Sequence, residues 1–206
     1  MGKSVLKATW QNILATSQKV KEGGVVVYPT DTVYGLGCDP FIIKAVERVF
    51  NVKNLRRKPL PILASDMKTV ERIAFLPEKA KSIANEFWPG PLTIVVPKKP
   101  ALPSIVTCDL NSVGVRVPKH DGALQLISLS NGLLIGTSAN KTGKKPPLSA
   151  QDAAEQLGRE VDLILDGGPS TLGVSSTVID LTSESPRILR KGPVGFGEIE
   201  QFLSKK

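Results

Sequence analysis

The chain has 206 residues, of which 41% are apolar and 22% charged, and this is the composition of an ordinary globular protein. No apolar run approaches the ~20 residues of a membrane-spanning helix, and the N-terminal segment has no hydrophobic signal core. The net charge of +8 favours phosphate-bearing or polyanionic partners, but it does not separate a nucleotide from a nucleic acid. We therefore expect one domain over residues 1–206, located in the cytoplasm and without membrane contact.

Cysteine and histidine are scarce in the chain. Cys38 and Cys108 are too few for a disulfide framework or a metal-ligand set. The single histidine, His120, argues against a His-based metal site and against a Ser-His-Asp triad. We therefore predict no metal held by the protein's own side chains.

The first elements in chain order are a helix, a strand and a second helix. Residues 5–22 carry apolar side chains near the helical period, and Gly23-Gly24 ends this predicted helix. A buried strand over 25–28 stops at Pro29, because proline has no N–H for a sheet ladder. Asp39-Pro40 then supplies a cap and a first residue for a helix over 40–52.

Hydroxyl side chains follow the first strand in the sequence PTDTVYGLG. In open α/β sheets ligands bind beyond the carboxyl ends of the strands, which is where Thr30, Thr32 and Tyr34 fall. Turn chemistry alone explains these residues equally well. The basic stretch 53–58 has the same ambiguity, since its cations either complement a helix dipole or bind an anion.

Strands and helices continue to alternate along the rest of the chain. We predict strands at 60–63, 92–96, 112–117, 133–136, 163–165, 177–181 and 187–192, with helices at about 65–74, 77–88, 121–130, 149–157 and 197–204. In SVGVRVP the valines face one way, and Arg116 shares the other face with Ser112. Arg116 is therefore either a bidentate hydrogen-bond donor for a carboxylate or phosphate, or an arginine on the protein surface.

Two later strand ends repeat the pattern of hydroxyl side chains. Residues 137–140 (TSAN) follow one strand, and Ser175, Ser176 and Thr177 open another. If these ends meet the first one, they form a polar, basic cleft without a nucleophile–base pair, a Walker A loop or a G-x-G-x-x-G motif. Phosphoryl or nucleotidyl transfer fits such a cleft, because it depends on positioning and charge stabilisation. The fold class that we predict is α/β, with a mixed sheet and flanking helices.

Seven motifs together resemble one known family. YPTDTVYGLG, WPGPLTIVVP, VGVRVP, TSAN, LDGG, SSTVID and ILRKG occur in this order in the YrdC/TsaC-like threonylcarbamoyl-AMP synthases, which the chain resembles over about residues 10–192. The resemblance implies a twisted, open α/β sheet around a large basic cavity. It also implies synthesis of threonylcarbamoyl-AMP and pyrophosphate from L-threonine, bicarbonate and ATP. The product then serves tRNA modification by a downstream transferase machinery, at the adenosine beside the anticodon.

The same resemblance implies roles for individual residues. Those expected to contact L-threonine are Thr32, Arg116, Gly136 and Ser176. Those expected to contact ATP are Arg56, Lys58, Ser112, Ser138, Pro146 and Arg190. Those expected to act in catalysis are Lys53, Arg56, Ser138 and Asn140. Mg²⁺ is expected to accompany the nucleotide and to be held mainly by its phosphates.

The chain departs from the family pattern in the basic motif. It reads Lys53-Asn-Leu-Arg56-Arg57-Lys58-Pro-Leu, one residue shorter than the commoner form, so either Arg56 or Arg57 fills the arginine position. Leu63 stands where some relatives have a substrate-contacting histidine. The chain is also expected to lack the C-terminal domain of longer relatives. Two alternatives remain open, namely an RNA-binding module that uses the basic cleft without catalysis and a same-fold paralogue with another substrate.

Overall fold

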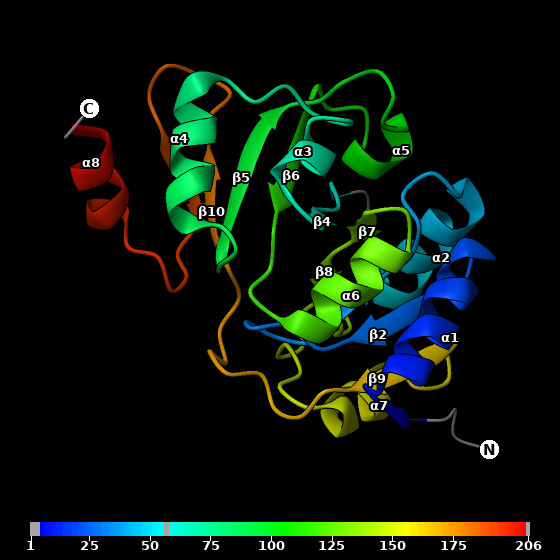
Figure 1. The fold of residues 1–206 in the computed structure, drawn as a ribbon. Helices are drawn as coiled ribbons and strands as arrows, with labels where there is room; N and C mark the ends of the chain where they lie inside the picture. Colours follow the sequence, from blue (N-terminus) through cyan, green and yellow to red (C-terminus); the bar gives the residue numbers. More distant parts are fainter. Residues whose placement is uncertain (1–4, 56–57, 205–206) are drawn as a thin grey trace.

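The computed structural model describes residues 5–55 and 58–204, which form two mixed sheets with helices around them (Figure 1). The predicted α/β class with mixed strand directions is confirmed, and the strands divide between two sheets. The strands are β1 (Val5–Lys7), β2 (Val26–Tyr28), β3 (Gly35–Gly37), β4 (Ile62–Ala64), β5 (Leu92–Pro97), β6 (Ser112–Arg116), β7 (Leu133–Ile135), β8 (Thr137–Ser138), β9 (Leu163–Asp166), β10 (Thr177–Asp180) and β11 (Arg187–Arg190). The helices are α1 (Trp10–Lys21), α2 (Ile43–Lys53), α3 (Met67–Val70), α4 (Glu78–Phe87), α5 (Ser104–Thr107), α6 (Asp121–Leu129), α7 (Ala150–Leu157) and α8 (Phe196–Ser204).

The smaller sheet has the strand order β1-β9-β2-β3-β8. Strands β1, β9 and β2 run parallel to one another. Strand β3 runs antiparallel to β2, and β8 runs antiparallel to β3. Val26 and Val27 on β2 pair with Leu163 and Ile164 on β9, and all three residues of β2 are buried. This sheet therefore brings the turn after β2 beside the short strand β8.

The larger sheet has the strand order β11-β10-β5-β6-β4-β7. Its parallel pairs are β10 with β5 and β4 with β6, and its other pairs are antiparallel. On β6 the alternation predicted from the sequence holds, since Val113 and Val115 are in the core and Arg116 faces the opposite side. Only Gly136 separates β7 of this sheet from β8 of the smaller one.

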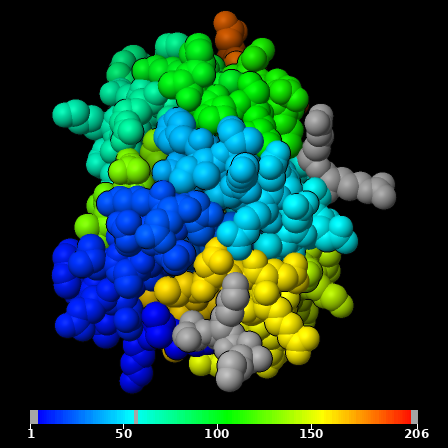
Figure 2. Space-filling model, turned by 90° about the vertical axis from the view of Figure 1, so that its right-hand side faces the viewer, coloured from blue at the N-terminus to red at the C-terminus, as the bar shows by residue number. Residues whose placement is uncertain are grey.

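Helices cover both sheets and connect distant segments. In Figure 1, α1 and α7 lie beside the smaller sheet, and α3, α4, α5 and α8 lie around the larger one, while α6 packs against α1 and against β4 and β7 of the larger sheet. Figure 2 shows the cyan of α2 beside the yellow of the segment that precedes β9, and an ion pair of 2.8 Å joins Arg48 to Asp162 across this border. No helix in the described ranges has the length and apolarity that crossing a membrane requires.

The N-terminal prediction needs a correction. Residues 5–7 form strand β1, and the helix begins only at Trp10, after Thr9 caps it. Pairing with β9 overrides the helical period here, and residues 5–7 instead form the edge strand of the smaller sheet. The second helix likewise begins at Ile43, because the Asp39 carboxylate bonds the Phe41 N–H in a turn that precedes the helix.

Candidate active site

A cavity of about 610 Å³ lies between the two sheets, within the size range of small-molecule sites. The three strand ends singled out by their hydroxyl groups meet there, through Thr30 and Thr32 to Gly35, Gly136 to Ser138, and Ser175 with Ser176. Thr177 is the exception, since its hydroxyl bonds the carbonyl of Val194. The convergence that the sequence analysis made conditional is therefore present.

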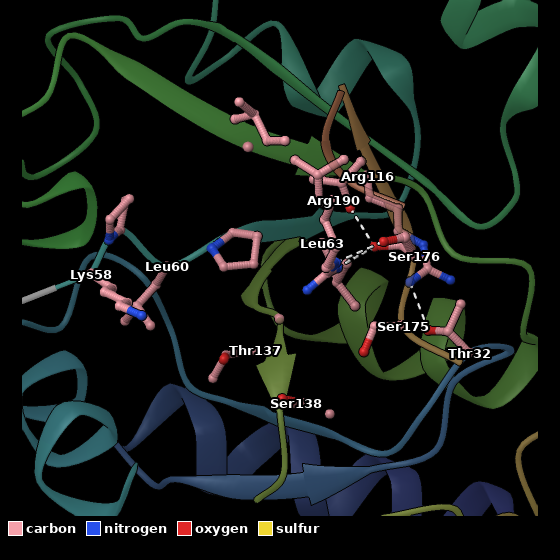
Figure 3. Close-up of a pocket in the computed structure, with 18 of the residues that line it drawn as sticks. Thr32, Lys58, Leu60, Leu63, Arg116, Thr137, Ser138, Ser175, Ser176 and Arg190 are labelled. Carbon is pink, nitrogen blue, oxygen red and sulfur yellow. Dashed lines mark hydrogen bonds between the residues drawn. The ribbon is translucent and has the colours of Figure 1, made fainter. Parts of the chain in front are cut away.

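Almost all of the predicted site residues line this cavity. They are Thr32, Lys53, Lys58, Ser112, Arg116, Gly136, Ser138, Asn140, Ser176 and Arg190. Pro146 is not among the lining residues, and both Arg56 and Arg57 fall outside the residues that the structure describes. In Figure 3, Thr32, Arg116, Ser176 and Arg190 lie close together on the right, apart from Lys58 and Ser138. We call Thr32, Arg116, Ser176 and Arg190 the arginine end of the cavity, and Lys53, Lys58, Ser138 and Asn140 the lysine end.

Arg116 is buried and held in place by hydrogen bonds. Its Nε donates to the Gly90 carbonyl at 2.8 Å, and one terminal nitrogen donates to Thr32 Oγ1 at 2.9 Å. The other terminal nitrogen forms an ion pair of 2.5 Å with Asp31, and both side chains are about 95% buried. Burial lowers the pKa of Arg116, and the Asp31 carboxylate opposes that shift. The guanidinium has further N–H groups without a partner among the described residues, so it can still donate hydrogen bonds to a ligand.

The hydroxyl groups of the first turn have a defined donor direction. Thr30 Oγ1 donates its hydrogen to the carbonyl of Val33 at 2.6 Å. The 3.1 Å contact between the Thr30 and Thr32 hydroxyls is therefore donated by Thr32. Since Thr32 Oγ1 also accepts from Arg116, it keeps one lone pair and no hydrogen for a ligand. Thr32 is thus an acceptor suited to an N–H donor such as an ammonium group.

Ser176 connects two strands at the arginine end. Arg190 donates from Nε to the Ser176 carbonyl and from a terminal nitrogen to Ser176 Oγ, both at 2.9 Å. The Ser176 hydroxyl also lies 2.8 Å from Thr93 Oγ1 on β5. Partial burial and the nearby charge of Arg116 lower the pKa of Arg190. The two guanidinium groups therefore concentrate positive charge at this end.

Close backbone packing at Gly192 supports this arrangement. A Cβ atom at Gly192 would lie 2.5 Å from the carbonyl oxygen of Ser175 and 2.6 Å from the carbonyl carbon of Ser176. Such distances are far below van der Waals contact, so only glycine lets the chain after Arg190 run against residues 175–177.

The lysine end is organised around backbone carbonyls. Lys53 Nζ donates to the carbonyls of Ser138 and Asn140 at 2.5 and 3.0 Å, and burial lowers the pKa of Lys53 from 10.5 to about 8. In the reverse direction, the backbone N–H and the hydroxyl of Thr142 donate to the Lys53 carbonyl. Lys53 and residues 138–142 therefore hold one another in position.

Asn140 holds the loop that follows it. Its side-chain amide donates to the carbonyls of Lys141 and Lys144, at 3.0 and 2.6 Å. Its amide oxygen accepts the hydroxyl hydrogen of Ser138 at 2.5 Å. The Ser138 hydroxyl consequently faces a ligand only as an acceptor, while Asn140 acts on the loop 141–145.

The described cavity wall carries more cations than carboxylates. Its cations are Lys53, Lys58, Arg116, Arg187 and Arg190. Among the lining residues that the structure describes, Asp180 is the one carboxylate, and it is paired with Arg187 at 3.1 Å, while Asp31 behind the wall is paired with Arg116. The described His, Cys, Asp and Glu residues include no group of three that could hold a metal ion. The wall is therefore suited to a ligand with several negative charges.

The groups that support these residues from behind were not predicted from the sequence. Asp31 lies in the turn PTDTVYGLG and was not among the predicted site residues, although its carboxylate pairs with Arg116, and Thr93 was predicted only as part of a strand. A polar residue inside an otherwise apolar strand, as in LTIVV, is the signal that could have identified Thr93.

Leu63 fills the position at which some relatives are expected to have a substrate-contacting histidine, and its Cδ2 would lie 2.9 Å from a Cβ atom at Gly136. A glycine is required there because Leu63 fills the space.

The family comparison matches most of the chain. The family model for Sua5, YciO and YrdC proteins, described as "Telomere recombination", matches residues 18–192. A threonylcarbamoyl-AMP synthase of Pyrococcus abyssi is 42% identical over 188 residues, which cover 90% of this chain and 55% of that protein. A putative threonylcarbamoyl-AMP synthase of Mycobacterium tuberculosis is 37% identical over 195 residues, covering 94% of this chain and 89% of that protein.

Solved structures agree with this match. The P. abyssi Sua5 structure complexed with L-threonine has a TM-score of 0.92 and 39% identity, covering 98% of this chain and 59% of that one. E. coli YciO has a TM-score of 0.82 and 27% identity, with 93% of each chain covered. The chain thus spans little more than half of the P. abyssi protein and nearly all of the YciO chain.

Proposed function

Because the chain belongs to the Sua5/YciO/YrdC family, we propose that it is an L-threonylcarbamoyladenylate synthase, a nucleotidyltransferase that uses L-threonine, bicarbonate or CO₂, and ATP. The names of the relatives at 37–42% identity support this proposal, as does the L-threonine complex of the P. abyssi protein. The observation that carries it here is the pairing of the two ends in one cavity. The arginine end offers donors and one acceptor for an amino acid, and the cations of the wall suit a triphosphate.

The proposed amino-acid site uses the donor directions derived above. Arg116 and Ser176 would hold the carboxylate of L-threonine, and the lone pair of Thr32 would accept an N–H of its amine. Gly136 is the remaining proposed L-threonine contact, and Leu63 fills the space that a Cβ atom there would need. The amine attacks CO₂, an N–C bond forms and a proton leaves, which gives a carbamate.

The proposed nucleotide site lies along the rest of the wall. A carbamate oxygen attacks the α-phosphorus of ATP, the bond from that phosphorus to its bridging oxygen breaks, and pyrophosphate leaves. Lys58, Ser112, Ser138, Pro146 and Arg190 are the proposed ATP contacts of the described chain, with Arg56 or Arg57 from the basic motif. Lys53 and Asn140 would act by fixing the Ser138 segment and the loop 141–145.

The metal in this proposal is part of the substrate. The only carboxylate of the described cavity wall is occupied by Arg187, so the wall fits a magnesium ion that arrives on the ATP phosphates. We further propose that residues 1–206 act as one YrdC-like domain, in the cytoplasm. The product would pass to a tRNA-modifying transferase machinery. RNA binding by the cleft and another substrate for the fold find no specific support here.

Pyrophosphate release tests the proposal directly. We expect release that requires L-threonine, bicarbonate and ATP together, with threonylcarbamoyl-AMP found by mass spectrometry. Omission of each substrate in turn is the control. A folded protein that releases no pyrophosphate with all three substrates, or releases it equally without L-threonine, would contradict the synthase assignment.

A further inference from the structure

The edge strand β11 carries two arginines, Arg187 and Arg190, and the proposed reaction uses only Arg190. Both arginines line the cavity, while Ile188 between them packs against the hydrophobic core. In a regular strand, residues three positions apart point to opposite faces. Strand β11 must therefore depart from regular pairing to place both arginines on the cavity side.

A β-bulge at Leu189 provides this departure. Asp180 pairs with Arg187, but Val178 pairs with Arg190, so one residue of β10 lies between the two pairs and two residues of β11 do. Bulges of this kind redirect side chains beside active sites. Here the bulge turns Arg190 onto the face that Arg187 occupies, and the two residues lie two ladder positions, or about 7 Å, apart along the sheet.

Arg187 is held at the cavity wall by Asp180, the residue opposite it. A terminal nitrogen of Arg187 donates to one carboxylate oxygen of Asp180 at 3.1 Å, and the other oxygen accepts from the N–H and the hydroxyl of Thr182. The Arg187 side chain is 74% exposed, against 12% for Asp180. The guanidinium has further N–H groups without a partner among the described residues, so they are free for an anion in the cavity.

We propose that Arg187 is a second nucleotide-binding arginine of β11, which donates hydrogen bonds to the polyphosphate of the bound nucleotide. This inference rests on the proposed function, since it takes a nucleoside triphosphate as the ligand of the wall. The carbamate has to reach the α-phosphorus, which places the α-phosphate near Arg190 and Ser176 at the arginine end. Arg187 lies further along β11, and as a planar cation it favours the phosphates beyond the α-phosphate over the neutral adenosine.

Nucleotide binding by Arg187→Gln tests this role. Calorimetry with AMP, ADP and ATP, without L-threonine, varies the phosphates and keeps the adenosine constant. We expect the dissociation constant of ATP to rise about three- to tenfold, and that of AMP to stay within about twofold of the wild-type value. The rise should shrink as the salt concentration increases, because the side chain is exposed.

Arg48→Gln is the matched control for the loss of one positive charge. Arg48 also forms an ion pair with an aspartate, Asp162, at 2.8 Å, and it is partly exposed. It is not among the described residues that line the cavity. All three dissociation constants should therefore stay as in the wild type.

An Asp180→Asn background separates a direct phosphate contact from charge neutralisation. Asparagine keeps an oxygen for Thr182 and removes the negative charge that Arg187 balances. If Arg187 contacts phosphate, Arg187→Gln should still weaken ATP binding in this background. If Arg187 only neutralises Asp180, the effect of Arg187→Gln should disappear there, and the proposal is then wrong.

The outcomes are distinct from those of the synthase test. Wild-type affinity for ATP in folded Arg187→Gln, or an equal loss for AMP and ATP, overturns the assignment of Arg187. If Arg187→Gln is poorly folded, Arg187→Met is measured in the same way. Wild-type protein that shows these differences in ATP binding but releases no pyrophosphate contradicts the synthase proposal and leaves the assignment of Arg187 standing.

Discussion

The two ends of the cavity are built by different means. At the arginine end, side chains bond mainly to other side chains, as in the contacts of Arg116 with Thr32 and Asp31. At the lysine end, side chains bond mostly to backbone carbonyls, as in the contacts of Lys53 and Asn140. Strands thus hold a fixed set of donors and acceptors at the first end, whereas side chains shape a loop at the second. We infer that a variant at the first end alters recognition directly and a variant at the second acts through the loop 141–145.

The largest expected effect is at the arginine end. Arg116→Met leaves Asp31 buried without its partner, and the free energy of unfolding should fall by about 3–5 kcal/mol. Urea denaturation measures this loss. Adding Asp31→Leu should recover much of it without restoring L-threonine binding, because no uncompensated charge then remains. Equal stability of the Arg116→Met protein and the wild type would show that the ion pair is not the support of this end.

A backbone change should affect the same end through its geometry. Gly192→Ala inserts a Cβ atom against the backbone of residues 175–177, and we expect a loss of about 1–3 kcal/mol in stability together with weaker L-threonine binding. Thermal unfolding and calorimetry measure the two effects. Gly197→Ala is the matched control, because nothing lies within 4 Å of its added Cβ and it falls in helix α8. A similar loss in both variants would contradict the role of close packing at Gly192.

The lysine end should respond to pH. Burial lowers the pKa of Lys53 to about 8, against 10.5 for an exposed lysine, so the ammonium charge is lost as the pH rises through about 8. Activity that depends on this cation should fall over that range, while arginine in Lys53→Arg stays charged and should remove this limb of the profile. An identical limb in Lys53→Arg would assign it to another group.

Stability should change with pH in the opposite direction. The unfolded chain binds more protons than the folded one between pH 8 and 10.5, so the contribution of Lys53 to stability should rise across this window. The difference in unfolding free energy between the wild type and Lys53→Met measures it. A difference that stays flat between these pH values would contradict the lowered pKa.

The smallest expected effect is in the loop itself. Thr142→Val removes the hydroxyl bond to the Lys53 carbonyl and keeps the backbone bond, so we expect a loss of about 1 kcal/mol or less. Hydrogen exchange of residues 141–145 should quicken, and L-threonine binding should stay as in the wild type. A change in L-threonine binding with unchanged exchange would contradict the separation of the two ends.

Much of this arrangement could be predicted from the sequence because local signals agreed with the fold. Alternation on SVGVRVP correctly separated the core valines from Arg116, and the hydroxyl-bearing strand ends correctly identified the cavity wall. The split into two sheets could not be predicted in this way, since pairing partners depend on long-range contacts. The predicted helix over residues 5–7 was wrong for the same reason, because the pairing of β1 with β9 overrides the local helical period.

The contacts that support the site residues could not be predicted from the sequence either. Asp31 and Thr93 are common residues in turns and strands, and nothing local indicates that one pairs with Arg116 and the other with Ser176. Their partners lie 85 and 83 positions away along the chain. The choice between Arg56 and Arg57 stays a prediction, as does the part that the basic motif takes in catalysis.

The passage of the chain through Gly136 has a consequence for how the protein unfolds. Strand β7 closes the edge of one sheet and β8 closes the edge of the other, with this single residue between them. The Tyr28 hydroxyl on the smaller sheet also bonds the carbonyl of Ile135 on the larger one. Neither sheet can therefore lose its edge strand without disturbing its neighbour. The two halves of the site are expected to form and melt in one cooperative transition, so a partly folded chain would have neither end of the cavity intact.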